Sequence, residues 1–153
     1  MLKKMKKAFT ITELVIVIAV IAILAAVLIP TFTTVVNNAN ESAAMQEAKS
    51  EWTNCSAEIV TSVDASDMNY LIVRNGYAFV VANGNFEVEP VTDTITGNDN
   101  KVIEVNDTFV YNSNTYTLKE TVTQIKDSDS NLLYEFDTDF TVYSLTVASG
   151  SQG

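Results

Sequence analysis

The feature that most constrains this chain is an apolar run close to its N-terminus. Every residue from Leu14 to Ile29 is apolar, and Phe9 and Ile11 extend the run toward the start of the chain. A stretch of about 20 apolar residues is long enough to cross the hydrocarbon core of a bilayer as an α-helix. The sequence therefore predicts one membrane-spanning helix over residues 9–30.

The charges that flank the run predict its orientation. The basic residues before the run are Lys3, Lys4, Lys6 and Lys7. After the run, the next basic residue is Lys49. Because positive charge is retained on the cytoplasmic side of a membrane span, we expect residues 1–8 in the cytoplasm and residues 31–153 outside. A secretory signal cleaved near Ala26 is an alternative, although such signals have a shorter core and carry no acid inside it.

Glu13 is the one acid within the run. An unpaired carboxylate inside the apolar boundary costs a few kcal/mol, and the run contains no cation. The sequence therefore predicts that Glu13 has a partner from elsewhere. The alternative is an interfacial acid tolerated in a plain single-pass anchor of an extracellular binding module.

The segment KKAFTITELVIVIAVIAILAAVLIP, residues 6–30, resembles the N-terminal class III signal of type IV pilins and pseudopilins. The resemblance implies that a prepilin peptidase cuts between Ala8 and Phe9, and that the new amino group of Phe9 is N-methylated. Glu13 stands at the fifth position from the cut, where the family keeps a glutamate, and Pro30 matches a proline common in these helices. Ala8 departs from the family, which mostly has glycine there.

The resemblance also implies a partner for Glu13. Cleavage would create an ammonium group on Phe9, and in a staggered stack of subunits it can pair with Glu13 of a neighbour, which would set the register of a filament. The implied partners are other copies or related pilin subunits, the prepilin peptidase and methyltransferase, the pilus or secretion assembly machinery and the membrane. The implied location is the cell membrane, then an extracellular filament. A pseudopilin of a type II secretion or competence apparatus is the alternative.

Composition argues against several other functions. The formal net charge is -10, and all 19 acids follow the basic leader, so a surface that binds nucleic acid directly is not expected. The chain has no histidine and one cysteine, Cys55. An intrachain disulfide, a Ser-His-Asp or Cys-His site and a zinc cluster are therefore excluded. We expect no cofactor and no enzyme activity.

Beyond the apolar run, the pattern changes twice. Apolar residues recur at three- and four-residue spacing up to Val63, which predicts an amphipathic continuation over residues 31–63 of one long helix kinked at Pro30. Cys55 lies on this apolar stripe and is expected to be a buried small hydrophobe. Residues 64–148 are rich in short strand and turn patterns, and residues 149–153 are expected to form a flexible tail.

Strands are expected in eight stretches, separated by Asn-, Asp- and Gly-rich turns such as Asn75-Gly76 and Asn83-Gly84-Asn85. They are Asn69–Val73, Tyr77–Val81, Phe86–Val88, Lys101–Val105, Thr108–Tyr111, Tyr116–Ile125 and Leu132–Phe136, followed by a closing strand over Phe140–Val147. Pro90 is expected to stop the third stretch, and residues 91–100 to form a loop. The fold class is therefore α+β and pilin-like: a long N-terminal helix packed on an antiparallel sheet.

One polar cluster resembles the opening of a calcium-binding loop, because oxygen-bearing side chains alternate at Asp127, Asp129 and Asn131. Leu132 replaces the glycine that an EF-hand turn requires, and Thr138 stands where the twelfth-position acid would be. A solvated turn is the alternative. The six tyrosines could form an adhesive surface or pack within the sheet.

Overall fold

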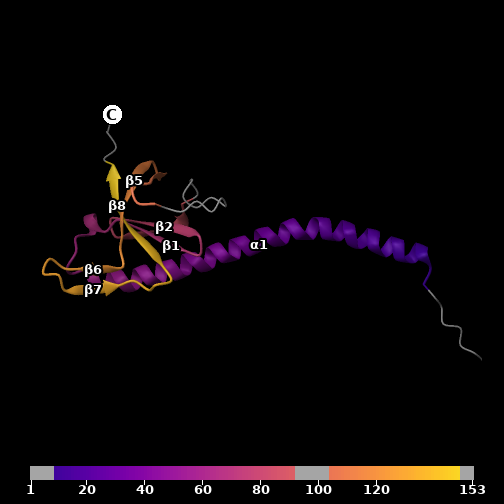
Figure 1. Cartoon of the computed structure of the whole chain (residues 1–153), viewed down its shortest axis with the longest axis horizontal. Helices are drawn as coiled ribbons and strands as arrows, with labels where there is room; N and C mark the ends of the chain where they lie inside the picture. The colour runs from indigo at the N-terminus through magenta and orange to yellow at the C-terminus, as the bar shows by residue number, and fades with distance from the viewer. Residues whose placement is uncertain (1–8, 92–103, 149–153) are drawn as a thin grey trace, which may run out of the picture. The chain divides into compact units, whose positions relative to one another are not determined.

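The computed structural model describes residues 9–91 and 104–148. Within these ranges a long helix, α1 (Ile11–Ile59), is followed by a short 3₁₀ helix, η1 (Ala65–Asp67), and then by strands (Figure 1). The strands are β1 (Tyr70–Arg74), β2 (Tyr77–Ala82), β3 (Asn85–Pro90), β4 (Thr108–Tyr111), β5 (Asn114–Thr121), β6 (Gln124–Lys126), β7 (Leu132–Glu135) and β8 (Thr141–Ala148). The predicted α+β class is confirmed. The expected leader, most of the expected 91–100 loop and the expected tail lie outside the described residues.

The chain divides into two compact units, and the division falls within α1. The first unit ends at Ala39 and the second begins at Asn40. In the first unit the helix continues through Pro30. In the second unit α1 ends at Ile59, before the expected end at Val63.

The end of α1 has a local cause. The amides of Ser62 and Val63 both donate to the carbonyl of Ile59, at 2.9 and 3.0 Å, so the chain tightens into a turn after that residue. The helix boundary therefore reflects the hydrogen bonding of its last turn and not a change in hydrophobic pattern.

The main sheet has the strand order β3-β2-β1-β8-β5-β4, and each neighbouring pair is antiparallel. Asn75-Gly76 joins β1 to β2 and Asn83-Gly84 joins β2 to β3, with positive φ angles at all four residues. Asparagine and glycine tolerate this left-handed conformation, which matches the twist of a two-residue hairpin. The turns expected from these two Asn-Gly pairs are confirmed.

The prediction of one strand over Tyr116–Ile125 is wrong, because the chain leaves the main sheet within it. β5 ends at Thr121, and the next amide, that of Val122, donates to Val142 at 2.8 Å. β6 then pairs with β7 in a separate two-stranded ribbon, which is closed by a hydrogen bond from the amide of Phe136 to the carbonyl of Thr123 at 2.9 Å. The strand-like pattern of residues 116–125 runs without a break, so it gives no sign that the chain changes its pairing partner from β8 to β7.

Two smaller expectations also differ from the structure. In the expected Lys101–Val105 strand, the described residues Glu104 and Val105 are not in a strand, and the amide of Asp107 donates to the carbonyl of Glu104 across a turn. Pro90 does not stop a strand at Val88 but is itself the last residue of β3. β3 is an edge strand, where a residue without an amide proton is tolerated.

Both faces of the central strands are buried. The face toward α1 forms a core with the buried helix residues, which are Ala44, Ala48, Trp52, Cys55 and Ile59. From β1, Ile72 enters this core, whereas its neighbour Leu71 enters a second core on the opposite face with Phe109 of β4 and Leu118 of β5. Alternate residues of a strand point to opposite faces, so a strand buried on both sides reads as a continuous apolar run.

Candidate functional site

The N-terminal end of α1 is held by a reciprocal pair, Thr10 and Glu13. The amide and hydroxyl of Thr10 donate to the same carboxylate oxygen, Oε2 of Glu13, at 2.9 and 2.8 Å. In return the amide of Glu13 donates to the hydroxyl oxygen of Thr10 at 3.2 Å. This arrangement is a capping box, which satisfies amide groups that the first turn of a helix leaves unpaired.

The capping box gives Glu13 a partner within its own chain, which the sequence reasoning missed. The signal was available, because a threonine followed three residues later by a glutamate at the start of an apolar run is the signature of this motif. Both bonds from Thr10 to the carboxylate use Oε2 of Glu13. Its other oxygen, Oε1, accepts no hydrogen bond within the described residues and remains available to a group from outside the chain.

The apolar part of α1 beyond the capping box is not covered by any other described residues. Every large apolar side chain from Phe9 to Val36 is exposed, including Phe9 at 81% and Phe32 at 70%. Among the described residues, α1 is the one helix that is long and apolar enough to cross a membrane. Monomeric soluble proteins rarely expose contiguous apolar surface on this scale, so the segment requires lipid or other subunits around it.

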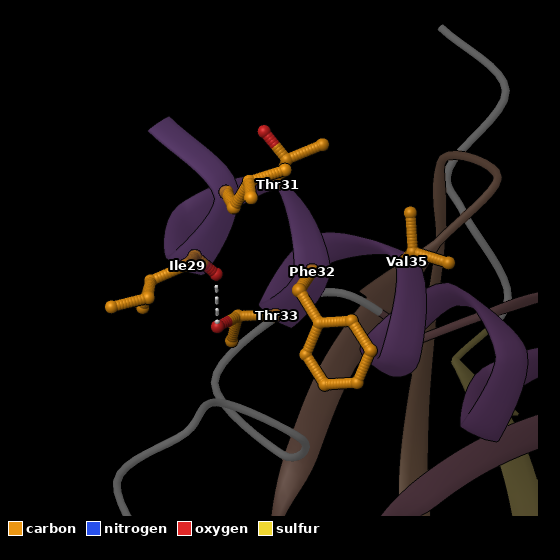
Figure 2. A pocket seen from close by; sticks show the side chains of 6 residues that line it. Ile29, Thr31, Phe32, Thr33 and Val35 are labelled. Atoms are coloured by element: carbon orange, nitrogen blue, oxygen red, sulfur yellow. Dashed lines mark hydrogen bonds between the residues drawn. The ribbon is translucent and has the colours of Figure 1, made fainter. Parts of the chain in front are cut away.

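Around Pro30, which has no amide proton to donate, three threonine hydroxyls form hydrogen bonds to backbone carbonyls of α1. The hydroxyls of Thr31, Thr33 and Thr34 donate to the carbonyls four residues earlier, at 3.0, 3.0 and 3.1 Å. Figure 2 shows the bond from Thr33 to Ile29 beside an open apolar hollow lined by Phe32. Because these hydroxyls are satisfied internally, the segment can enter an apolar environment without exposing unpaired donors.

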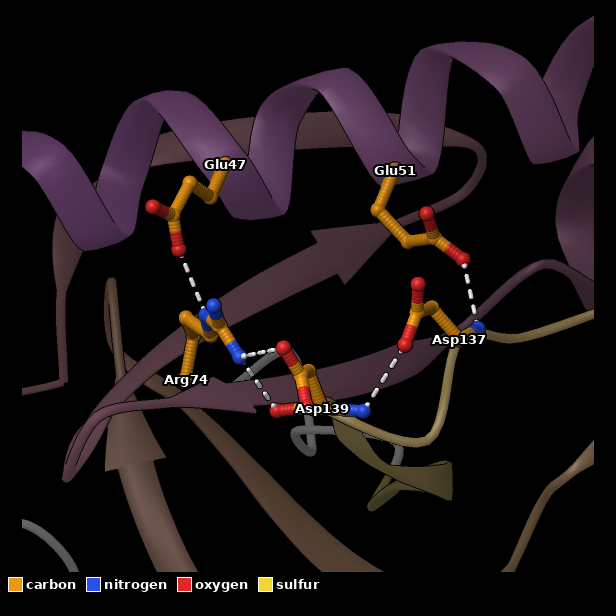
Figure 3. A network of polar contacts seen from close by, with 5 residues as sticks. All are labelled: Glu47, Glu51, Arg74, Asp137 and Asp139. Atoms are coloured by element: carbon orange, nitrogen blue, oxygen red, sulfur yellow. Dashed lines mark hydrogen bonds and ion pairs between the residues drawn. The ribbon is translucent and has the colours of Figure 1, made fainter.

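A polar network lies where α1 meets the strands (Figure 3). We call it the carboxylate clasp, and its five residues are Glu47, Glu51, Arg74, Asp137 and Asp139. Glu47 of α1 forms an ion pair with Arg74 at the end of β1. Arg74 also contacts the carboxylate of Asp139 at 3.1 Å and its backbone carbonyl at 3.0 Å. The hydrogen bond that Arg74 donates to Glu47 is the main cause that raises the pKa of Arg74.

Glu51 forms the second half of the clasp, one helical turn after Glu47. Its Oε1 accepts hydrogen bonds from the hydroxyl of Tyr134 and the amide of Asp137, each at 3.1 Å. Burial, followed by the charge of Glu51, raises the pKa of Tyr134. The clasp therefore attaches both the β6–β7 ribbon and the loop before β8 to α1.

The proposed calcium ligands form a tightly bonded turn between β6 and β7. Oδ1 of Asp127 accepts from the amides of Asp129 and Asn131, at 2.9 and 2.8 Å, and its Oδ2 accepts from the side-chain amide of Asn131 at 2.9 Å. The bond from the Asn131 side chain is the main cause that lowers the pKa of Asp127. Within residues 9–91 and 104–148, no group of three or more His, Cys, Asp or Glu side chains is placed to hold a metal ion.

The remaining candidate residues pack inside the second unit. Cys55 is fully buried, and burial raises the pKa of its thiol to about 12, so the prediction of a buried small hydrophobe is confirmed. The tyrosines are used mainly in packing, with Tyr70, Tyr111, Tyr116 and Tyr143 buried and Tyr77 and Tyr134 half-buried. Of the other predicted site residues, Ala8 and the four leader lysines lie outside the described residues.

Comparison with family models finds one match, to the prokaryotic N-terminal methylation motif, over residues 3–29. The chain therefore carries the type IV prepilin-type signal. The match covers the leader lysines, Ala8, Phe9 and Glu13, and it ends one residue before Pro30. It supports membrane anchoring and a pilin-like structural class. Neither the curated proteins nor the solved structures compared with this chain include a match.

Proposed function

We propose that this protein is a type IV pilin-like structural subunit that polymerises through its N-terminal helix into a surface filament. The observation that carries the proposal is the coincidence of the methylation motif with a helical segment, up to Val36, whose large apolar side chains are all exposed. A heterologous contact between such helices generates a fibre when the rotation does not close. The acidic, β-rich part of the chain, residues 64–148, would then lie on the outside of the filament, and the apolar helices would form its dry axis.

In this proposal, residues 1–8 face the cytoplasm before assembly, and a prepilin peptidase cuts between Ala8 and Phe9. The enzyme then methylates the Phe9 amine, and a dedicated assembly machine draws the subunit out of the membrane. The ammonium of one subunit pairs with Glu13 of a neighbour. The open Oε1 of Glu13 supports this role, because a carboxylate oriented by its own capping box needs little reordering to accept a second donor.

The processing step is tested by the mass and N-terminal sequence of the protein recovered from native membranes and from sheared surface material. The expected mature chain begins at methylated Phe9. A chain that still begins at Met1, or one that begins beyond Ala26, would contradict the proposal. The length of the fibres in the sheared fraction separates a pilus from the short fibre of a secretion or competence pseudopilin.

The role of Glu13 is tested by three variants that separate its charge from its capping function. Glu13→Val loses both and is expected to insert and be cleaved normally, yet to form no filaments. Glu13→Gln retains an acceptor for the capping box but loses the charge, and it is also expected to form none. Glu58→Gln, which removes an exposed acid from the distant end of α1, is the control and is expected to assemble normally.

The glutamine variant decides between the two interpretations. If Glu13→Gln forms normal filaments and Glu13→Val does not, then Glu13 acts as a helix cap, and the proposed pairing with Phe9 is wrong. Normal filaments from both variants would contradict any assembly role for Glu13.

A further inference from the structure

Two turns of the second unit have the same central residues and nearly the same backbone. Asn75 and Gly76, between β1 and β2, have φ angles of 50° and 82°, and Asn83 and Gly84, between β2 and β3, have φ angles of 50° and 79°. These are the two Asn-Gly pairs in the sequence. They form a matched pair in which one chemical reaction can be compared within a single chain.

An asparagine followed by glycine is open to a spontaneous intramolecular reaction, because glycine has no side chain to shield its backbone nitrogen. That nitrogen attacks Cγ of the asparagine and forms a new C–N bond. The bond from Cγ to the side-chain nitrogen breaks, and this nitrogen leaves as ammonia with the proton of the glycine amide. Water then opens the cyclic succinimide at either carbonyl, which gives aspartate or isoaspartate.

The turn at Asn83 and Gly84 is fastened to its surroundings at three points. The amide of Gly84 donates to the carbonyl of Met68 at 2.9 Å, and the amide of Asn83 donates to Oδ1 of Asn69 at 3.0 Å. Nε1 of Trp52 donates to the carbonyl of Gly84 at 3.1 Å. A side chain at Gly84 would also contact Met68. The nucleophilic nitrogen of this turn is therefore occupied, and the turn opens only when these bonds break.

The turn at Asn75 and Gly76 has no comparable fastening. Both residues are exposed, and a side chain added at Gly76 would meet nothing within 4 Å. In the described part of the chain, neither residue has a hydrogen bond outside the hairpin that it closes. Local opening, which brings the glycine nitrogen to Cγ, therefore breaks fewer contacts here than at Asn83.

We propose that Asn75 is a site of spontaneous deamidation in the folded protein and that Asn83 is protected by the hydrogen bonds that it and Gly84 form with Asn69, Met68 and Trp52. This inference is independent of filament assembly. The reaction has a local consequence, because it places a new carboxylate next to Arg74 of the carboxylate clasp. The isoaspartate product also adds a methylene to the backbone of a two-residue turn, at the point where Arg74 pairs with Tyr77.

The test is to age the full chain in detergent, at mildly alkaline pH and in heavy-oxygen water, and to follow both asparagines by peptide mass spectrometry. Isotope incorporation distinguishes conversion during the experiment from earlier damage. In the folded protein, Asn75 is expected to convert at least about tenfold faster than Asn83, since opening the second turn breaks three additional hydrogen bonds. In urea, where the fold is lost, the two rates are expected to become similar.

A variant that loosens the protected turn provides a second measurement. Trp52→Phe keeps an aromatic ring in the core but removes the donor to Gly84, so it is expected to raise the rate at Asn83 several-fold while leaving Asn75 unchanged. Equal rates at the two asparagines in the folded wild-type chain would overturn the proposal. So would the absence of conversion at Asn75 under conditions in which both asparagines react in urea.

Discussion

The two units of this protein treat apolar side chains in opposite ways. In residues 9–39 the large apolar side chains of α1 are exposed to the surroundings of the chain, whereas from Ala44 onward one stripe of the same helix is buried against the sheet. The helical backbone is continuous across the division. The comparison shows that helical structure does not require tertiary packing. Both segments are helical, but only the second packs against the sheet.

The two halves of α1 accordingly obtain their stability from different sources. The second half gains from burial of side chains such as Trp52 and Ile59, which is worth about 1.5–3 kcal/mol for a large aliphatic residue. The first half gains no such burial from the described residues, so its apolar contacts must come from lipid or from other protein molecules. The second unit therefore contains its own buried core, whereas the described residues of the first unit contain none.

The largest expected difference between the two units is in thiol reactivity. Cys55 is fully buried, and burial raises the pKa of its thiol to about 12. In the folded state a reagent therefore cannot reach the sulfur, and little of the reactive thiolate is present. A maleimide or disulfide reagent is expected to modify Cys55 at least about a thousandfold more slowly in the folded chain than in urea, since modification requires unfolding.

The matched control places a cysteine in the first unit. Asn38→Cys in a Cys55→Ala background sits on an exposed part of α1 and is expected to react at a similar rate in the folded and denatured chains. Rapid modification of Cys55 in the folded protein would contradict the burial of this helix face.

A core truncation is expected to separate the two units by stability. Phe79 is fully buried between α1 and the sheet, so Phe79→Ala should lower the free energy of unfolding by about 3–5 kcal/mol. Phe32→Ala removes the same atoms from an exposed site and should change it by less than about 0.5 kcal/mol. Urea denaturation in detergent, followed by the fluorescence of Trp52, measures both variants. Similar losses in both would show that the units do not differ as described.

Much of the fold could be predicted from the sequence because its signals are local. The apolar run, the Asn-Gly turns and the strand Thr108–Tyr111 are each specified by a few neighbouring residues, and the structure contains all of them. The change of strand partner after Thr121 could not be predicted, because it depends on pairing with residues distant in sequence.

The candidate site divides in the same way. The prepilin-type signal was evident from its motif, and the capping partner Thr10 could have been found from the same few residues. The carboxylate clasp was not predictable, since Glu47 and Arg74 become neighbours only when α1 packs on β1. Nor could the start of helix burial be placed, because Val36 and Ala39 continue the apolar stripe yet are exposed.

The smallest expected effect concerns the clasp, which links α1 to the strands through partly exposed charges. The side chain of Arg74 is 19% exposed and that of Glu47 is 45% exposed, so water screens their ion pair and limits its contribution. A double-mutant cycle with Arg74→Met and Glu47→Gln is expected to give a small, favourable coupling energy that falls as salt is added. The same cycle with Glu58→Gln in place of Glu47→Gln should give no coupling. A coupling energy near zero for the Glu47 pair would mean that this ion pair does not help to hold α1 on the sheet. The contrast between the two units would then rest on the hydrogen bonds of Glu51 and Trp52 and on buried side chains.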